Sequence, residues 1–219
     1  MKRNNKEKSF AIAGGASEKG IVFGNTFNKY ESSNPIVKWM MKGFDSSLQS
    51  LVDKCEVTDI HEVGCGEGFW VNKWNASNIN ARGSDFSTEV IHIAKQNARA
   101  LQLDENKFSV CSIYDLQKGK DSASLIICCE VLEHLENPVA GIKKLQEITE
   151  EYLIVSVPRE PIWRILNMAR GKYLACYGNT PGHLQHWSKN SFIEFVNGYF
   201  DVLQVAAPFP WTMLLCRKR

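Results

Sequence analysis

The pattern of hydrophobic positions predicts a helix near the start of the chain. From Pro35 to residue 51, large apolar residues recur at steps of three and four, which is the spacing of one helical face. These residues are Ile36, Met40, Phe44, Leu48 and Leu51. We therefore expect an amphipathic helix that packs against a core.

Beyond residue 56, short apolar runs alternate with helix-like segments. The runs predict strands at 57–63, 81–85, 108–113, 125–129 and 153–157. Ser87 and the pair Asn137-Pro138 are typical helix starts. Strands that alternate with helices indicate a mostly parallel sheet with helices on both faces.

The C-terminal part follows a different pattern. A helix near 191–196 precedes two strand-like segments, 201–206 and 212–219, with only a short Pro-containing turn between them. Two strands joined in this way are antiparallel. The expected fold class is therefore α/β, with a Rossmann-like seven-stranded sheet, mostly parallel, and a C-terminal antiparallel hairpin.

The same pattern indicates how the chain is divided. The 219 residues exceed the roughly 150 of a typical domain, so we expect one domain with an additional segment. We assign 1–34, which is polar and Gly-rich, to an N-terminal arm or lid, mobile and ordered by a ligand, and 35–219 to a single domain. Within that domain, the aromatic-rich stretch 158–188 is interpreted as an insertion on the substrate side.

Composition narrows the class of protein. The net charge of +2 lacks the basic excess typical of nucleic-acid-binding proteins. The seven cysteines include no C-x-x-C pair, which favours free thiols in a reducing compartment. No apolar run is long enough for a signal peptide or a membrane span. We therefore expect a cytoplasmic protein with neither a membrane nor a nucleic acid as partner.

The segment His61–Gly68 carries the strongest chemical signal. Its glycines, Gly64, Gly66 and Gly68, stand at steps of two directly after a strand, so the backbone can approach a ligand closely. A dinucleotide-binding loop would need glycine at Phe69, which argues against a nicotinamide oxidoreductase.

Two carboxylates accompany this loop. Glu62 lies two residues before the first glycine, and a carboxylate there suits a ligand with a cationic end. Asp85 lies at the end of the second strand, where an acid can accept hydrogen bonds from both hydroxyls of a ribose.

Four segments in order, EVGCGEG, GSDFS, SIYDL and CCEVLEHLENP, resemble class I S-adenosylmethionine-dependent methyltransferases of the small-molecule, type 11-like group. The resemblance covers residues 57–157. It implies S-adenosyl-L-methionine as cofactor, S-adenosyl-L-homocysteine as product, and transfer of the methyl group by in-line displacement to an oxygen or nitrogen atom of a small metabolite.

The resemblance also implies a set of cofactor-binding residues. They are Glu62, Gly64, Cys65 and Gly66 near the methionine part, Asp85 at the ribose, Phe86, Ser112 and Ile113 around the adenine, and Glu130 after the fourth strand. Many relatives carry Asp where Ser112 stands. We add Tyr30 of the arm as a lid contact to the cofactor. His134 matches a histidine common in the group, whereas Glu133 is interpreted as a solvated helix charge.

The insertion supplies the expected acceptor site. Its candidate substrate-binding residues are Arg159, Trp163, Tyr173 and Trp187. His183 and His186, three positions apart, could share a helical face and are the candidate catalytic residues, as general bases. A metal would need a third ligand, and local spacing offers none, so no metal is predicted.

Two alternatives remain open at this point: an RNA-directed methyltransferase and a catalytically silent cofactor-binding scaffold. The sequence leaves the acceptor, the methylated atom and the oligomeric state undetermined.

Overall fold

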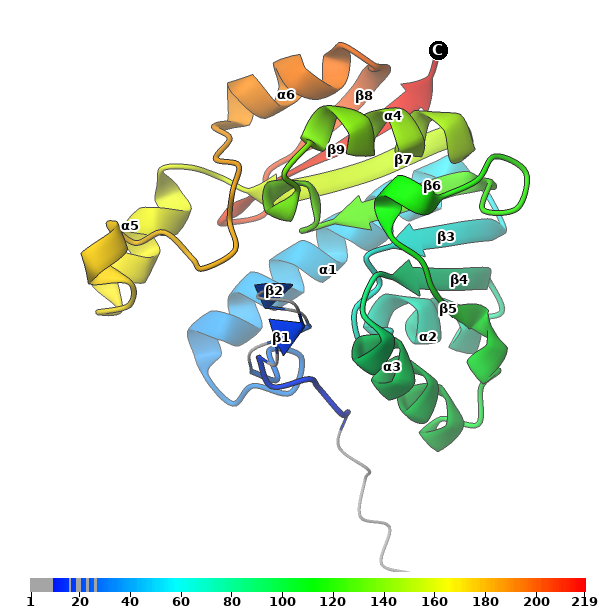
Figure 1. The fold of residues 1–219 in the computed structure, drawn as a ribbon, viewed down its shortest axis with the longest axis horizontal. Coiled ribbons are helices and arrows are strands. Elements are labelled where there is room, and N and C mark those ends of the chain that lie inside the picture. Colours follow the sequence, from blue (N-terminus) through cyan, green and yellow to red (C-terminus); the bar gives the residue numbers. More distant parts are fainter. Residues whose placement is uncertain (1–9, 16, 19–20, 23, 26) are drawn as a thin grey trace, which may run out of the picture.

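The computed structural model describes residues 10–15, 17–18, 21–22, 24–25 and 27–219, and within these residues seven strands form one sheet (Figure 1). The strand order is β5-β4-β3-β6-β7-β9-β8. The strands are β3 (Asp59–Val63), β4 (Asn80–Asp85), β5 (Phe108–Val110), β6 (Ala123–Cys129), β7 (Thr149–Pro158), β8 (Phe200–Ala206) and β9 (Trp211–Lys218). The first five are parallel, and β9 lies antiparallel between β7 and β8. The predicted fold class is confirmed.

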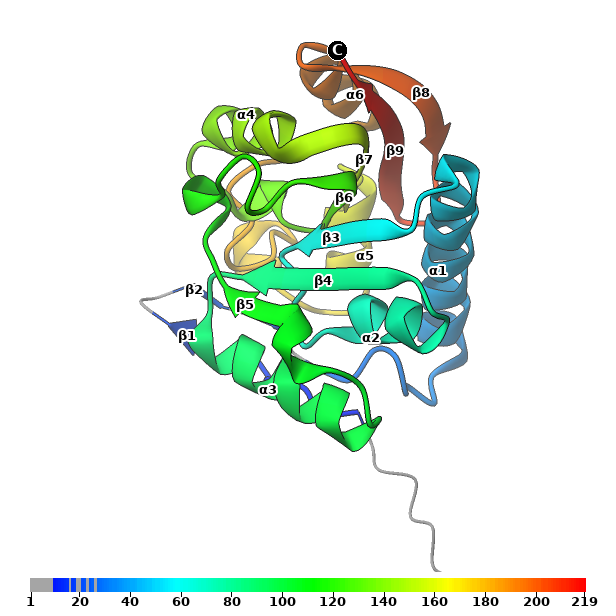
Figure 2. The ribbon, with the colours of Figure 1, turned by 90° about the vertical axis from the view of Figure 1, so that its right-hand side faces the viewer.

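Helices cover both faces of this sheet (Figure 2). One face carries α1 (Pro35–Cys55), α2 (Phe69–Ala76) and α3 (Thr88–Ala100), and the other carries α4 (Pro138–Ile148) and α6 (Lys189–Asn197). Two short strands in the N-terminal arm, β1 (Ser17–Glu18) and β2 (Ile21–Val22), pair with each other. The sheet is therefore the middle of three layers.

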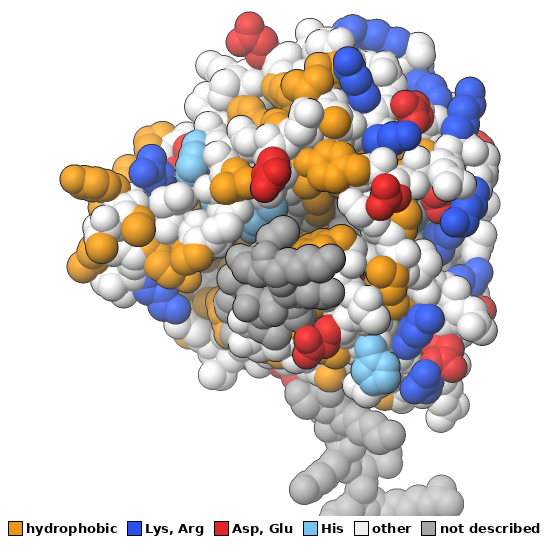
Figure 3. All heavy atoms as spheres, viewed as in Figure 1, with side chains coloured by type: hydrophobic (Ala, Val, Ile, Leu, Met, Phe, Trp, Pro, Cys, Tyr) orange, Lys and Arg blue, Asp and Glu red, His pale blue; other side chains and the backbone are white. Residues whose placement is uncertain are grey.

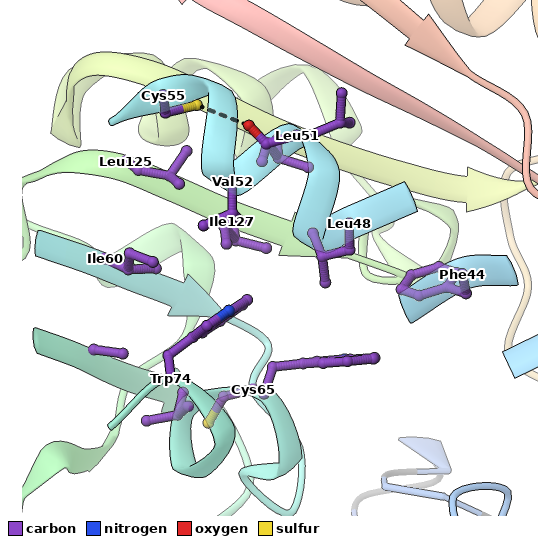
Figure 4. Close-up of a cluster of buried hydrophobic side chains, with 14 of the residues drawn as sticks. Phe44, Leu48, Leu51, Val52, Cys55, Ile60, Cys65, Trp74, Leu125 and Ile127 are labelled. Atoms are coloured by element: carbon purple, nitrogen blue, oxygen red, sulfur yellow. Dashed lines mark hydrogen bonds between the residues drawn. The ribbon is translucent and has the colours of Figure 1, made fainter. Parts of the chain in front are cut away.

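The alternation of side chains along β6 creates two cores. Leu125 and Ile127 face the first core, whereas Ile126 and Cys128 face the second, and none of them is exposed. Figure 4 shows the first core, where side chains of α1 such as Leu48 meet those of the sheet. Complete burial of a large aliphatic side chain contributes about 1.5–3 kcal/mol, so this central strand stabilises both layers.

The helix starts predicted from the sequence carry the expected caps. The side chain of Asn34 accepts hydrogen bonds from the first turn of α1, and Pro35 occupies a position where no backbone N–H is needed. Ser87 caps α3, and Asn137 caps α4. Some strand limits differ from the prediction: β3 begins at Asp59, and β5 ends at Val110.

The topology opens a crevice between two central strands. The chain runs from β3 outward to β4 and β5, then returns to form β6 on the other side of β3. Ligands in open α/β sheets bind at the carboxyl ends of the strands where the order reverses in this way. The glycine segment follows β3, and Glu130 follows β6, so both lie at this edge.

The stretch 158–188 contains a helix that the sequence analysis did not anticipate. This helix, α5 (Ile162–Ala169), projects beyond the sheet in Figure 1. Apolar side chains gather over this part of the surface in Figure 3. Ile165 and Met168 of α5 are exposed. No helix in the described part of the chain is long and apolar enough to cross a membrane.

Candidate functional site

The glycine loop is packed tightly against the segment that follows β6. Gly64 has φ +77°, and a Cβ atom there would lie 2.2 Å from a methyl group of Val131. The backbone N–H groups of Gly64 and Cys65 both donate to the carbonyl of Ser84. Only glycine tolerates this conformation at such close approach, which joins the ends of β3, β4 and β6 into one rigid edge.

Asp85 is held by the backbone on both of its oxygens. Oδ2 accepts a hydrogen bond from Gly66 N at 3.1 Å, and Oδ1 accepts one from Ser87 N at 3.0 Å. Desolvation raises the pKa of Asp85, and these two bonds oppose that rise. A carboxylate has about four lone-pair sites, so each oxygen can accept a further bond from a ligand.

Glu62 is a buried carboxylate with an unsatisfied oxygen. The residue is 3% exposed, and Oε2 has no hydrogen-bond partner among the described residues. Burial raises the pKa of Glu62 well above its usual range, and the nearby charge of Asp85 adds to the rise. A buried acceptor without a partner is rare in proteins, and a ligand that donates to it would supply the missing bond.

The described part of the N-terminal arm is fastened to the glycine loop through Glu67. Oε1 accepts hydrogen bonds from the backbone N–H groups of Ala13 and Asn25, at 3.1 and 2.7 Å, and Oε2 accepts one from the Asn25 side chain. Asn97 of α3 binds both the backbone of Ala11 and the carbonyl of Glu67. The arm thus contacts the glycine loop over this stretch, and its mobility and its role as a lid stay predictions. Residues 1–9, 16, 19–20, 23 and 26 of the arm lie outside the described residues.

Two further arm residues lie beside the loop. The ring of Tyr30 stacks on Phe69, with ring centroids 3.8 Å apart and planes 5° apart. Lys29 lies near the carboxylates of Glu130 and Glu67; desolvation lowers its pKa, and those charges oppose the effect. The arm therefore brings an aromatic ring and an amine to the edge of the crevice.

The residues expected around the adenine occupy different environments. Phe86 is 43% exposed after β4, and Ser112 caps a short turn by accepting from Tyr114 N. Ile113 is buried in the second core. Burial raises the pKa of the Cys65 thiol well above its usual range, so it is an unreactive filler.

Glu130 is fixed at the end of β6 in a left-handed conformation with φ +59°. Its Oε1 accepts from Ser156 Oγ at 2.9 Å, and its Oε2 accepts from Trp211 Nε1 at 2.7 Å. Desolvation raises the pKa of Glu130 to about 7, and the charge of Lys29 opposes this rise most strongly. The carboxyl group is therefore firmly oriented at the crevice.

A cluster beside it joins two distant segments. Potential ligand atoms of Glu133, His134 and His183 all lie within 4.8 Å of one another. Glu133 is 2% exposed, so its interpretation as a solvated charge is wrong. Burial lowers the pKa of His183 to about 3, and burial raises the pKa of Glu133 well above its usual range. Sequence reasoning missed this trio because local spacing does not reveal which loops meet.

The two candidate histidines of the insertion do not share a helix. Residues 183–186 lie in a loop, with His183 buried and His186 exposed. His186 Nε2 lies 2.7 Å from Asn179 Oδ1. The ring of His183 stacks near Trp163, with centroids 6.1 Å apart, and meets His134 edge-on. Only His183 therefore joins the cluster.

The remaining predicted substrate-binding residues are scattered. Trp187 packs on Phe192 and Phe195 beside the second core, and Tyr173 lies at the surface. Arg159 follows β7, and its buried Nε has no hydrogen-bond partner among the described residues. Of the predicted substrate-binding residues, Trp163 thus lies near the cluster, and Arg159 offers a donor that no described residue uses.

A family model described as "Methyltransferase domain" matches residues 54–191. The search among curated proteins found no match. Among solved structures, magnesium protoporphyrin IX methyltransferase from Synechocystis PCC 6803 with bound SAH has a TM-score of 0.67 and 18% identity, over 89% of this chain and 94% of that one.

Two other solved structures are similar to a comparable extent. PH0226 protein from Pyrococcus horikoshii OT3 has a TM-score of 0.68 and 12% identity, covering 85% of this chain and 93% of that one. N-methyltransferase NodS from Bradyrhizobium japonicum WM9 has a TM-score of 0.61 and 16% identity, covering 85% and 98%. At these identities the similarity shows a shared fold.

Proposed function

Because the chain belongs to the methyltransferase domain family, we propose that it transfers a methyl group from S-adenosylmethionine to an oxygen or nitrogen atom of a small-molecule acceptor. The observation that carries this proposal is the pair of carboxylates at the glycine loop. Oε2 of Glu62 is buried and has no hydrogen-bond partner among the described residues, and the two Asp85 oxygens are held by Gly66 N and Ser87 N with acceptor capacity remaining.

The residues present fit the two ends of this cofactor. The unsatisfied oxygen of Glu62 suits the amino group of the methionine part, since an ammonium group donates hydrogen bonds and its positive charge would favour the ionised form of Glu62 on binding. Asp85 suits the ribose, because two hydroxyls can donate to its remaining lone pairs. At Gly66 a Cβ would meet nothing within 4 Å, so the loop there is open toward a ligand.

The cofactor, when bound, supplies an electrophilic methyl group on a sulfonium sulfur. The protein's part is to hold the acceptor in line with that group and to exclude water, and positioning can contribute up to about 7–11 kcal/mol in favourable cases. The arm contributes to the exclusion of water because Glu67 holds it onto the glycine loop and Tyr30 stacks on Phe69. We place the acceptor between this edge and the insertion.

On the acceptor side we retain Arg159, Trp163 and His183. The Nε of Arg159 is a buried donor with no partner in the described residues and suits a carbonyl or anionic oxygen of the acceptor. His183 is neutral at physiological pH, and its pKa of about 3 makes it a poor general base there. We therefore propose that His183 presents the lone pair of its unprotonated ring nitrogen on the acceptor side of the site. His186, at the surface, stays outside this proposal.

We propose that the protein acts in the cytoplasm. This proposal is supported by its seven cysteines, which are all free in the structure, as is typical of a reducing compartment.

Calorimetric titration of the full chain with S-adenosylhomocysteine tests the proposal directly. We expect saturable binding at one site, and methyl transfer from labelled S-adenosylmethionine to small molecules of a metabolite pool. No binding at millimolar ligand would overturn the proposal. Methyl transfer to RNA alone, with steep salt dependence of RNA binding, would instead favour the RNA-directed alternative.

A further inference from the structure

We infer that Glu133, His134 and His183 form a binding site for a divalent transition-metal ion beside the proposed acceptor site. Their potential ligand atoms lie within 4.8 Å of one another. A first-row ion binds imidazole nitrogen and carboxylate oxygen at about 2.0–2.2 Å, so atoms up to about 4.4 Å apart can share one ion. A shift of a few tenths of an ångström in the side chains would close the remaining difference.

Glu133 provides the first independent observation. Its side chain is 2% exposed, and both carboxylate oxygens lack a hydrogen-bond partner among the described residues. Buried charged groups are normally paired or coordinate metals, because desolvation of an isolated carboxylate is costly. A bound cation would satisfy both oxygens at once.

The hydrogen bond of His134 provides the second independent observation. Nδ1 lies 2.9 Å from the carbonyl oxygen of Gly182, which can only accept, so Nδ1 carries the proton. The lone pair is therefore on Nε2, which lies 4.0 Å from Glu133 Oε1. Metal-binding histidines are commonly oriented by such a bond from the second ring nitrogen to a carbonyl.

Backbone hydrogen bonds hold the loop that bears His183 next to the segment that bears Glu133 and His134. The N–H groups of Leu184 and Gln185 both donate to the carbonyl of Glu133, at 2.8 and 2.9 Å. The insertion loop that bears His183 is thereby tied to the segment after β6. The ring of Trp163 lies beside that of His183, with centroids 6.1 Å apart. The three side chains are thus arranged by contacts that do not depend on an ion.

The donor set indicates which ions fit. One carboxylate and two neutral imidazoles suit Zn²⁺, Fe²⁺, Co²⁺ or Mn²⁺ better than Mg²⁺ or Ca²⁺, which prefer oxygen ligands throughout. Three protein ligands leave a position open for water or a substrate oxygen. If the proposed function holds, a hydroxyl of the acceptor coordinated there would lose its proton more readily.

Metal binding to the full chain, first treated with a chelator, tests the inference without reference to activity. We expect equilibrium dialysis to yield one equivalent of Co²⁺ or Zn²⁺, a visible Co²⁺ absorption band that Zn²⁺ abolishes, and a higher melting temperature with the ion. His183→Ala should weaken the affinity at least about 100-fold, because a direct ligand matters more than the outer partners whose loss costs 10–100-fold.

Matched variants locate the site. His186→Ala, three positions away and exposed, should bind the ion as the wild type does, as should His92→Ala on the surface of α3. Glu133→Gln keeps the shape of the buried side chain and should lose binding; if it fails to fold, His183→Ala decides. The inference is wrong if the wild type binds no ion at one equivalent, or if His183→Ala binds as tightly. S-adenosylhomocysteine titration of the same samples tests the proposed function separately.

Discussion

Gly66 donates its backbone N–H to Oδ2 of Asp85 across 3.1 Å, which joins the glycine loop to the end of the neighbouring strand. The second oxygen of Asp85 is held by Ser87 N, the residue that caps α3. The carboxylate is therefore oriented by two rigid elements and needs little rearrangement to accept further bonds. This preorganisation gives the first prediction.

Asp85→Asn should weaken S-adenosylhomocysteine binding about 10- to 100-fold. An amide retains only one accepting oxygen, and hydrogen bonds to charged groups contribute about 1.5–3 kcal/mol, where 1.4 kcal/mol is a factor of ten. Calorimetric titration measures the change. Asp53→Asn, on the exposed surface of α1, should bind like the wild type. Equal affinity of the two variants would refute the role given to Asp85.

Glu62→Gln should stabilise the ligand-free protein at alkaline pH while weakening cofactor binding. Burial raises the pKa of Glu62, so the folded state favours the protonated form. Such a group contributes stability that is present in full below its unfolded pKa, about 4.3, and is lost as the pH rises toward the folded pKa. The amide is neutral at every pH and avoids this loss.

The measurement for Glu62→Gln is a pair of thermal melts without ligand. At pH 8 the variant should melt above the wild type, by about 2–4 °C for each kcal/mol in a chain of this size. The difference should shrink as the pH falls toward about 4–5. A variant that melts below the wild type at pH 8 would contradict the assignment of an unsatisfied, costly carboxylate at this position.

Glu67→Ala should release the N-terminal arm. The variant loses the three hydrogen bonds that hold Ala13 and Asn25 on the glycine loop. We expect faster tryptic cleavage after Lys29, followed by mass spectrometry, and weaker cofactor binding because the arm no longer covers the crevice. Glu89→Ala, in the exposed first turn of α3, is the matched control. Unchanged cleavage would show that Glu67 does not anchor the arm.

Replacement of Gly64, Gly66 and Gly119 by alanine, one at a time, separates the effect of packing from the effect of ligand access. Each has a positive φ, which costs about 1–2 kcal/mol for alanine. At Gly64 the clash with Val131 adds about 1–3 kcal/mol. Gly66→Ala and Gly119→Ala meet no atoms within 4 Å and should lower stability equally, but only Gly66→Ala should reduce cofactor affinity. Denaturant unfolding and calorimetry distinguish these outcomes, and equal cofactor affinity at positions 66 and 119 would contradict the site.

Local patterns in the sequence were sufficient for much of the fold. The helix starts at Asn34, Ser87 and Asn137 and the buried runs of β6 and β7 depend on neighbours within a few residues, so periodicity and caps predict them. The antiparallel hairpin at the C-terminus followed from the shortness of its turn. The helix α5 is short and lies within the stretch that was interpreted from its aromatic residues as an insertion, so its own apolar periodicity was not used.

For the site, the sequence by itself determined the glycine loop and its two carboxylates, because each belongs to a short motif at a strand end. The sequence did not determine which residues lie in contact across the crevice. That His183 joins Glu133 while His186 points elsewhere, and that Glu67 holds the arm, was decided only by the tertiary structure. The physical reason is that these contacts join segments far apart in the chain, and packing of the whole domain sets which of them lie within bonding distance.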